Sequence, residues 1–340
     1  MNLQALCDGL RQSRGFAHKR DISDVMGTLN RALPGLANSP VRVGDDCAAI
    51  PQGDGHLLFA MEGFVEDFVE RMPWFAGYCG VMVNVSDVAA MGGRPVAIVD
   101  ALWSAGAASG QPILEGLAAA SERYGVPIVG GHSNHRSERS QLAVAIVGQA
   151  RRLLTSFDAR PGDALVAAID LRGRWQEPYP YWDASTQAPA QRLRDDLAVL
   201  PELAESGLCC AAKDISMAGT LGTALMLLEC SGVGARIDVA RIPRPASVAQ
   251  DDDAALLRWL SAFPSYGFIL SVAPDALPQV LDRFAARDIA AAQIGRVEAG
   301  SMLTLSDRDT HALLWDHAAE PFICAPRSAT PQTSLETAHA

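Results

Sequence analysis

Apolar and polar residues follow one another along the first half of this chain with periods that predict both helices and strands. Apolar residues at helical spacing predict one or two helices within Leu3–Leu36, and short apolar runs predict strands at Val41–Val43 and Leu57–Met61. Turn-forming residues at Pro51–Gly55 separate two such runs and predict a hairpin. The pattern then predicts three strands and a helix, the strands at Val96–Leu102, Val126–Val129 and Gln141–Gln149 and the helix at Gln111–Tyr124.

A long apolar segment, Trp74–Met91, predicts a buried helix in the middle of this half. Gly92 and Gly93 follow it directly and are typical of a helix end, and Pro95 prevents the helix from resuming. Because strands and helices are mixed, the first half predicts an α+β domain.

The second half begins with a change in composition. The segment Arg151–Gly162 ends in a Pro-Gly turn, which predicts a domain boundary before the apolar strand Ala164–Ile169. A long loop follows at Leu171–Pro189, and long ordered loops tend to carry function. Further helices are predicted at Gln191–Leu200, Met217–Ser231 and Leu277–Arg287, and strands at Gly267–Val272 and Ala291–Val297. We expect domains at 1–150 and 151–325 and a flexible tail at 326–340, which is rich in Ser, Thr, Pro and Ala.

Composition excludes several classes of function and leaves the predicted fold unchanged. The chain has 340 residues, of which 49% are apolar, enough to build two cores. A formal net charge of −11 argues against nucleic acid or an anionic membrane as a partner, since both attract basic surfaces. The seven cysteines contain no CxxC pair, and no apolar run is long enough for a signal peptide or a membrane span. We therefore expect a cytoplasmic protein that acts on a small molecule.

Polar residues interrupt the apolar helix at two positions that share a face. Asn84 and Asp87 are three residues apart, so they project from the same side of the predicted helix. Small residues follow them at Ala89–Gly93, which permits close approach of a ligand or another backbone. A buried helix whose Asn and Asp satisfy nearby backbone groups would show the same pattern.

Further acids stand at the ends of predicted strands. Asp45 and Asp46 follow Gly44, and adjacent carboxylates in a tight turn repel each other unless a cation or solvent relieves them. Mg²⁺ suits such a place because it prefers oxygen ligands and takes one or two carboxylates beside phosphate oxygens. Glu62 follows another strand and can add a ligand. A solvated turn is the alternative interpretation of the Asp pair.

Gly130 and Gly131 follow the apolar residues Pro127–Val129, where open backbone N–H groups can bind an anion without a P-loop. His132 and Ser133 add polar side chains at the same point. The chain contains no GxxxxGK[ST] and no GxGxxG segment, so P-loop and Rossmann interpretations lose their support. Together these segments predict a magnesium-nucleotide enzyme.

The same segments carry a resemblance to a known superfamily. VGDDCAAI, NVSDVAAMGGRP, VGGHS, RPGDALVAAID, KDIS, SGVGARIDVARIP and the pair GFILSV…AAQIGRV resemble, in order and spacing, the superfamily of aminoimidazole ribonucleotide (AIR) synthase. That superfamily also contains thiamine-monophosphate kinase, selenophosphate synthetase and a hydrogenase maturation factor. The resemblance covers about Arg42–Glu298. It implies a two-domain AIR-synthase-like α+β fold and a homodimer in which the N-terminal α/β domains share a β-barrel.

The resemblance also implies an active site in a cleft between the two domains. Asp45, Asp46 and Asp87 match the family's metal-binding acids, and Asp214 matches the aspartate of its DIS segment. The set expected to hold Mg²⁺ is thus Asp45, Asp46, Glu62, Asp87 and Asp214, and the set expected to hold ATP is Asn84, Gly130, Gly131, His132 and Ser133. The implied chemistry is attack of a substrate oxygen on the γ-phosphate of ATP, with magnesium ions neutralising the developing charge.

Three departures separate the chain from thiamine-monophosphate kinases. Glu62, His132 and Met217 stand where those kinases have aspartates. The reactive Cys or selenocysteine of selenophosphate synthetases and the Gly-Val-Gly-Thr-Lys type of segment of AIR synthase are absent as well. The resemblance therefore predicts the superfamily and leaves the member open.

Two features are particular to this chain. Lys19 is expected to fold over the phosphates and to act in catalysis with Asp87 and Asp214, although an exposed lysine on a surface helix gives the same sequence. Arg172 and Arg174, in an aromatic-rich loop, are expected to hold an anionic substrate, and an interdomain or dimer contact is the alternative.

The sequence thus predicts ATP- and Mg²⁺-dependent phosphoryl transfer to, or ATP-driven activation of, an oxygen of a small polar substrate. Thiamine-monophosphate kinase itself is the nearest alternative. A nucleotide-binding partner protein without turnover is a second, because three acids are replaced.

Overall fold

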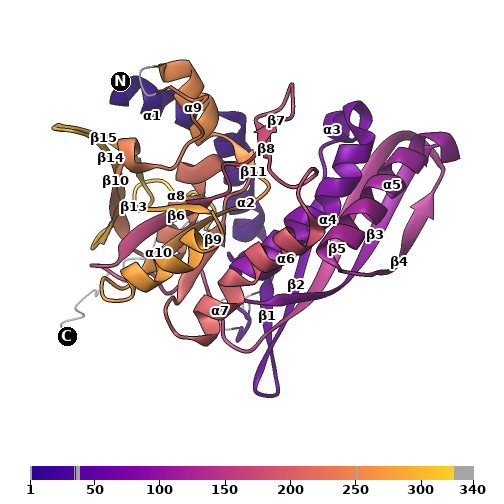
Figure 1. Cartoon of the computed structure of the whole chain (residues 1–340), viewed down its shortest axis with the longest axis horizontal. Coiled ribbons are helices and arrows are strands. Elements are labelled where there is room, and N and C mark those ends of the chain that lie inside the picture. Colours follow the sequence, from indigo (N-terminus) through magenta and orange to yellow (C-terminus); the bar gives the residue numbers. More distant parts are fainter. Residues whose placement is uncertain (1, 34, 36–38, 250–251, 325–340) are drawn as a thin grey trace, which may run out of the picture.

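The computed structural model describes residues 2–33, 35, 39–249 and 252–324, and these form two α+β domains side by side (Figure 1). The tail expected at 326–340 lies outside the described residues. In the described part no helix combines the length and the apolar character needed to cross a membrane.

The first domain is built on a five-stranded sheet. Its strands are β1 (Ala48–Gln52), β2 (Gly55–Gly63), β3 (Arg94–Ala105), β4 (Ile128–Asn134) and β5 (Arg136–Ala150), in the order β1-β2-β5-β3-β4. Helices α3 (Glu66–Arg71), α4 (Pro73–Ala90) and α5 (Ala107–Tyr124) pack on one face (Figure 1). Among the described residues this sheet is open and closes no barrel.

The hairpin β1–β2 confirms the turn expected at Pro51–Gly55, but the strand expected at Val41–Val43 is wrong. Residues 41–47 form an irregular loop, and strand pairing begins only at Ala48, opposite Phe59. Gly44 has a φ of +118°, which a strand does not allow, so the chain bends away from the sheet here.

Helix α4 confirms the buried helix expected at Trp74–Met91. Nearly all of its residues are buried, and Pro73 occupies its first turn, where a missing N–H costs nothing. The helix ends where Gly92 adopts a φ of +71°. Its last turn contacts the second domain, because Ala89 and Ala90 pack in a hydrophobic core formed by residues of that domain.

The second domain contains a seven-stranded sheet with helices on both faces. The strands are β6 (Ala164–Ile169), β9 (Ala211–Asp214), β10 (Gly234–Asp238), β12 (Gly267–Val272), β13 (Ala290–Glu298), β14 (Met302–Asp307) and β15 (Thr310–Asp316), in the order β15-β14-β10-β13-β6-β12-β9. A small sheet joins β7 (Arg174–Trp175), β8 (Tyr181–Asp183) and β11 (Phe263–Pro264). The helices are α6 (Ala190–Leu197), α7 (Val199–Glu205), α8 (Gly219–Ser231), α9 (Asp253–Leu260) and α10 (Leu277–Ala285), with a short 3₁₀ turn, η2 (Val239–Arg241).

Strand β6 shows why the domain has two cores. Its alternate residues Leu165, Ala167 and Ile169 belong to one hydrophobic core, and Ala164, Val166 and Ala168 belong to the other. Side chains on a strand point to opposite faces in turn, so a strand covered on both sides must be apolar throughout.

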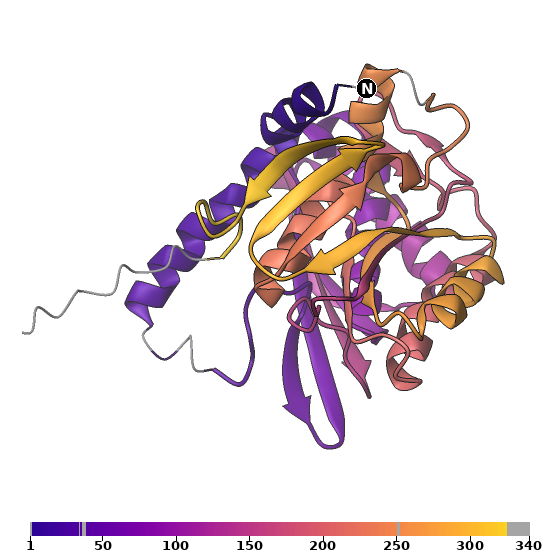
Figure 2. The same ribbon diagram turned by 90° about the vertical axis from the view of Figure 1, so that its left-hand side faces the viewer.

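The first two helices pack on the second domain, although the predicted boundaries assigned them to the first. Helix α1 (Leu3–Arg11) packs on β14 and β15, and α2 (Arg14–Ala32) packs on α8, as Figure 2 shows along the side of the second domain. Leu3, Leu6 and Phe16 share a core with β6 and α8. The segment expected within domain 1–150 therefore crosses to the second domain before the chain enters the first sheet.

Candidate functional site

A cavity of about 800 Å³ lies between the two domains. Its wall is formed by one side of α2, the irregular loop before β1, the end of β2, the last turns of α4 and the end of β9. The predicted residues found in this wall are Lys19, Asp45, Asp46, Glu62, Asp87 and Asp214. Residues far apart in the sequence thus meet in one cavity.

Three carboxylates stand close together at its base. Asp46, Asp87 and Asp214 each place one oxygen so that the three atoms lie within 4.8 Å of one another. Opposite ligands of one Mg²⁺ are about 4.2 Å apart, at roughly 2.1 Å from the ion. Small side-chain adjustments would therefore close these oxygens around one ion.

Asp87 shows most clearly that the cluster fits a cation. Asp87 is only 6% exposed, and its Oδ2 has no hydrogen-bond partner among the residues that the structure describes. Burial raises the pKa of Asp87 well above its usual value, and the nearby carboxylates of Asp214 and Glu62 raise it further. Burial also raises the pKa of Asp214, followed by the effect of Asp46. Such carboxylates need a proton or a cation at neutral pH.

Asp46 is held in place by two groups from β9. One of its oxygens accepts a hydrogen bond from the ammonium of Lys213, and the other accepts one from the backbone N–H of Asp214 at 3.2 Å. The side chains of Lys213 and Asp46 are only 6% and 5% exposed. Burial by itself would lower the pKa of Lys213, but Asp46 and Asp45 outweigh it and raise that pKa. Lys213 is therefore a buried cation beside the cluster.

Asp45 is held by hydrogen bonds and does not belong to the three-carboxylate cluster. Its carboxylate accepts a hydrogen bond from Ser156 Oγ at 2.6 Å and from the Ser156 N–H at 2.9 Å, and the N–H of Asp46 donates to it at 3.1 Å. Burial raises its pKa to about 6, with Lys213 acting in the opposite direction. Asp45 lies in the cavity wall but outside the three-carboxylate cluster, and its predicted role as a metal ligand stays a prediction.

Glu62 and Lys19 line the same cavity and interact electrostatically with the cluster. Glu62 is the next-to-last residue of β2, and its pKa is raised by removal from bulk water, with Lys19 as the largest opposing influence. Lys19 projects from α2, whose residues Ile22, Met26 and Asn30 continue along the cavity wall at helical spacing. The predicted position of Lys19 over a bound phosphate is compatible with this geometry.

These pKa shifts predict how the metal-free protein responds to pH. In the unfolded chain the pKa of Asp87 is about 3.9, so between that value and its raised native pKa the folded state binds more protons. The stability that Asp87 contributes is therefore greatest at low pH and is lost as pH rises through its native pKa. The charged groups facing it are Asp214, Glu62, Asp46 and Lys213.

We expect metal-free protein to melt at a higher temperature near pH 5 than near pH 7.5, and we expect Asp87→Asn to reduce this difference. Thermal unfolding in EDTA measures both. Identical pH dependence in the two proteins would remove Asp87 as a source of the effect.

Asn84 is placed differently from the acids. It is fully buried, and its amide donates to Gly80 O at 2.8 Å and to Val144 O at 3.1 Å, which ties α4 to β5. It is not among the residues that line the cavity. Asn84 therefore matches the alternative interpretation, in which a buried polar side chain bonds to nearby backbone groups. Asp87, three residues later on the same helix, lines the cavity.

The residues expected to form a nucleotide loop lie in a strand. Gly130, Gly131, His132 and Ser133 continue β4 and pair in parallel with residues 99–102 of β3. β4 is an edge strand, these four residues are exposed, and none lines this chain's cavity. The concavity expected after Val129 is therefore replaced by extended backbone.

The two arginines expected to bind substrate also lie elsewhere. Arg172 bonds to Asp170 at 2.8 Å and to Asp196 at 3.1 Å, which ties the loop to α6. Arg174 is exposed on β7, and neither lines the cavity. The same loop contacts the first domain, because Tyr179 Oη donates to Asp67 at 2.7 Å. The Tyr179 contact matches the interdomain alternative for this loop, whereas the ion pairs of Arg172 lie within the second domain. The predicted substrate role of Arg172 and Arg174 stays a prediction.

Lys213 is the site residue that the sequence analysis missed. A signal was present, since the chain contains only two lysines, Lys19 and Lys213, among its 28 basic residues. Both line the same cavity. In addition, a lysine within the apolar strand CCAAKD is costly to bury without a partner, so an acid had to meet it.

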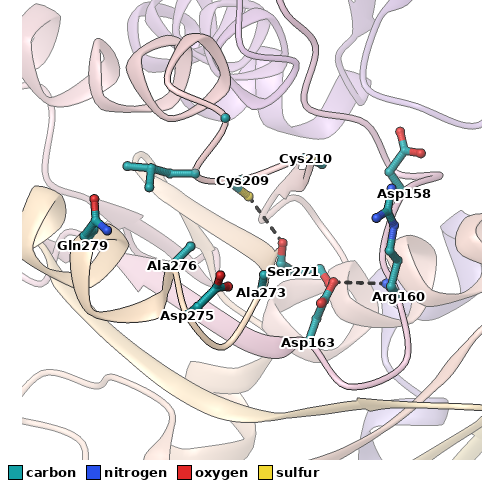
Figure 3. Close-up of a pocket in the computed structure, with 12 residues that line it drawn as sticks. Asp158, Arg160, Asp163, Cys209, Cys210, Ser271, Ala273, Asp275, Ala276 and Gln279 are labelled. Carbon is teal, nitrogen blue, oxygen red and sulfur yellow. Dashed lines mark hydrogen bonds between the residues drawn. The ribbon is translucent and has the colours of Figure 1, made fainter.

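A second cavity of about 330 Å³ lies on the second domain and is lined by other residues (Figure 3). There Asp163 accepts hydrogen bonds from Ser271 Oγ at 2.8 Å and from the Arg160 N–H at 3.1 Å. Its carboxylate thus has partners from the protein, unlike Asp87 Oδ2. The interdomain cavity is the better candidate for chemistry.

Comparisons with known proteins agree with the two-domain organisation. The family model "AIR synthase related protein, N-terminal domain" matches residues 44–150, and "AIR synthase related protein, C-terminal domain" matches residues 162–308. The chain is 45% identical to an uncharacterised protein of Synechocystis sp., over 92% of this chain and 95% of that one. It is 28% identical to a thiamine-monophosphate kinase of Synechococcus elongatus, over 82% of this chain and 91% of the kinase.

A solved structure shares the fold. The structure titled "T. maritima PurL complexed with ATP" superposes with a TM-score of 0.67 at 20% identity. The match covers 83% of this chain and 47% of that one, so this chain corresponds to about half of the larger protein.

Proposed function

The chain belongs to the AIR synthase related protein family, and we propose that it binds Mg²⁺ and ATP between its domains and transfers the γ-phosphoryl group to, or uses it to activate, an oxygen of a small substrate. The observation that carries the proposal is the meeting of Asp46, Asp87 and Asp214 within 4.8 Å at the base of the interdomain cavity. The buried Asp87 Oδ2 without a partner supports a cation there.

The chain's own residues would divide the work as follows. Asp46, Asp87 and Asp214 hold the divalent ion, which when bound would neutralise phosphate charge. Lys19 faces the same cavity and can contact a phosphate oxygen as a point charge. A cavity of about 800 Å³ is within the usual range for ligand sites, which reaches about 1,000 Å³. The rate enhancement would then come from positioning and fixed charge.

Binding of Mg²⁺ and ATP to the protein tests the proposal directly. A ligand at 100 times its dissociation constant stabilises a folded protein by about 2.7 kcal/mol, so Mg-ATP should raise the melting temperature clearly. EDTA should abolish the increase, since the triphosphate then lacks its ion. No stabilisation by Mg-ATP would refute the proposal, and stabilisation without ADP release against any acceptor would favour a nucleotide-binding partner protein.

Thiamine-monophosphate kinase is the second candidate, because a relative of that name is 28% identical over most of both chains. The local chemistry at Met217 argues against it. Met217 lines the cavity and its sulfur lies 3.2 Å from His18 Nδ1, so an apolar side chain occupies a position where those kinases are expected to carry an acid. We expect no thiamine diphosphate to form from thiamine monophosphate and Mg-ATP, and rapid formation would establish the kinase.

We also propose that the protein is a homodimer. The face of the first sheet opposite α4 and α5 exposes Phe59, Met61, Val99 and Val129 at 43 to 64% of their surfaces. Large exposed apolar patches typically mark interfaces, and a second copy completing a barrel would cover this one. The nucleotide role expected of Gly130–Ser133 would then require contact with the cavity of the second copy. Sedimentation equilibrium that gives a monomer mass would exclude this arrangement.

A further inference from the structure

Lys213 is an unusual residue for its surroundings. It lies in β9 between Ala212 and Asp214, its side chain is 6% exposed, and its ammonium contacts Asp46. Taking an ammonium out of water is costly unless a carboxylate and further hydrogen bonds compensate. The chain otherwise uses arginine almost everywhere, with 26 of its 28 basic residues, and both lysines line this one cavity. The choice of lysine over arginine at this position therefore indicates a specific role for a compact ammonium in the cavity.

The contacts of Asp46 show what Lys213 does locally. Lys213 binds one oxygen of Asp46 while the N–H of Asp214 binds the other. These two bonds fix the orientation of a carboxylate that belongs to the three-acid cluster. Lys213 thus acts through Asp46 and is a positioning residue.

The contacts of Asp45 limit where ions can bind. Ser156 donates to both of its oxygens, and the Asp46 N–H donates to it as well. Two donors already occupy Oδ1 of Asp45 and one donates to its Oδ2, so an ion shared between Asp45 and Asp46 would have to bind at the remaining lone pair of Oδ2 and displace the ammonium of Lys213 from Asp46. The ammonium of Lys213 already supplies a positive charge beside Asp45 and Asp46.

We propose that Lys213 is a built-in cation that takes the place of a second divalent ion beside Asp45 and Asp46, so that the Asp46–Asp87–Asp214 cluster binds one divalent ion per chain. This inference rests on the proposed magnesium-nucleotide function and specifies its metal stoichiometry. Five carboxylates (Asp45, Asp46, Glu62, Asp87 and Asp214) and the ammonium groups of Lys19 and Lys213 line the same cavity, so a single divalent ion leaves a small residual charge. Arginine would suit this position less well, because its guanidinium is larger and binds in a planar fork.

Metal stoichiometry on the full-length chain tests the inference without relying on turnover. Mn²⁺ replaces Mg²⁺ as an oxygen-preferring probe, and electron paramagnetic resonance of unbound Mn²⁺ counts the ions bound. Titrations are made with the protein alone and with the protein saturated with AMPPCP. The wild-type chain should bind one Mn²⁺ at the carboxylate cluster, and any ion bound only by the analogue's phosphates is identified by comparing the two titrations.

Two variants separate charge from structure. Lys213→Met keeps most of the length of the unbranched side chain and removes its charge, so it should bind one additional Mn²⁺ beside Asp45 and Asp46 in the titration without nucleotide. Lys213→Arg keeps the charge and should retain the wild-type stoichiometry. Lys19→Met is the matched control, since it removes the only other lysine of the same cavity, and Lys19 makes no contact with Asp46 in the described structure.

The outcomes are distinguishable. Two or more ions in the nucleotide-free wild-type protein, or equal stoichiometry in wild type and Lys213→Met, would overturn the inference and leave the proposed function standing. Absence of Mn²⁺ binding with and without AMPPCP would overturn both. If Lys213→Met does not fold, as judged by circular dichroism, the wild-type and Lys213→Arg stoichiometries still decide.

Discussion

Replacing Asp87 with asparagine should lower the rate of Mg-ATP turnover on the order of 10³-fold while leaving the fold intact. The amide has the size of the carboxylate but no charge, so it is a much weaker ligand for Mg²⁺. The same change should raise the melting temperature of the metal-free protein near neutral pH. Asp87 is buried among Asp214, Glu62 and Asp46, and removing its charge relieves their repulsion.

The opposite signs of these two effects make the prediction specific. A structural residue would lose stability and activity together, whereas a metal ligand loses activity and gains metal-free stability. ADP release and thermal unfolding in EDTA measure the two quantities. Asp24→Asn is the matched control, because Asp24 is an exposed acid of α2 that does not line the cavity, and we expect it to change neither. An unchanged turnover in Asp87→Asn would remove Asp87 from the metal site.

Replacing Gly15 with alanine should have the second large effect, on both stability and nucleotide binding. Gly15 lies in the first turn of α2, and a Cβ at this position would lie 2.2 Å from Met217 O and 2.9 Å from Ala218 Cα. These are backbone atoms of the segment after β9, so α2 must shift away from the second domain. Overpacking of this kind costs about 1–3 kcal/mol in the free energy of unfolding. Since α2 carries Lys19, the stabilisation by Mg-ATP should fall as well.

Urea unfolding with and without Mg-ATP measures both parts of this prediction. Gly35→Ala is the control, because a Cβ there meets no atom within 4 Å among the described residues considered, and the residue follows the same helix. Equal unfolding curves for Gly15→Ala and wild type would show that α2 is not packed tightly against the second domain. The assignment of α2 to the cavity wall would then be wrong.

Particular residues show how far sequence reasoning reached. The spacing of Asn84 and Asp87 predicted a shared polar face on α4, and both residues do lie on that buried helix. Spacing could not tell which of them faces the cavity. The amide of Asn84 donates to the backbone of β5, whereas the carboxylate of Asp87 lies beside that of Asp214 at the end of β9. Asp45 and Asp46 are adjacent in sequence, yet only Asp46 joins the cluster, since Ser156 holds Asp45.

The sequence by itself determined the elements and the residue types available for chemistry. Apolar periodicity specifies α4 and the strands, and the acids at 46, 87 and 214 stand next to apolar runs that must be buried. Only the tertiary structure decided that these acids meet, that Lys213 pairs with Asp46 across 167 residues, and that α2 packs on the second domain. The physical reason is that periodicity reports which side of an element is buried, whereas convergence depends on how the end of α4 and the end of β9 pack against each other, which no local pattern encodes.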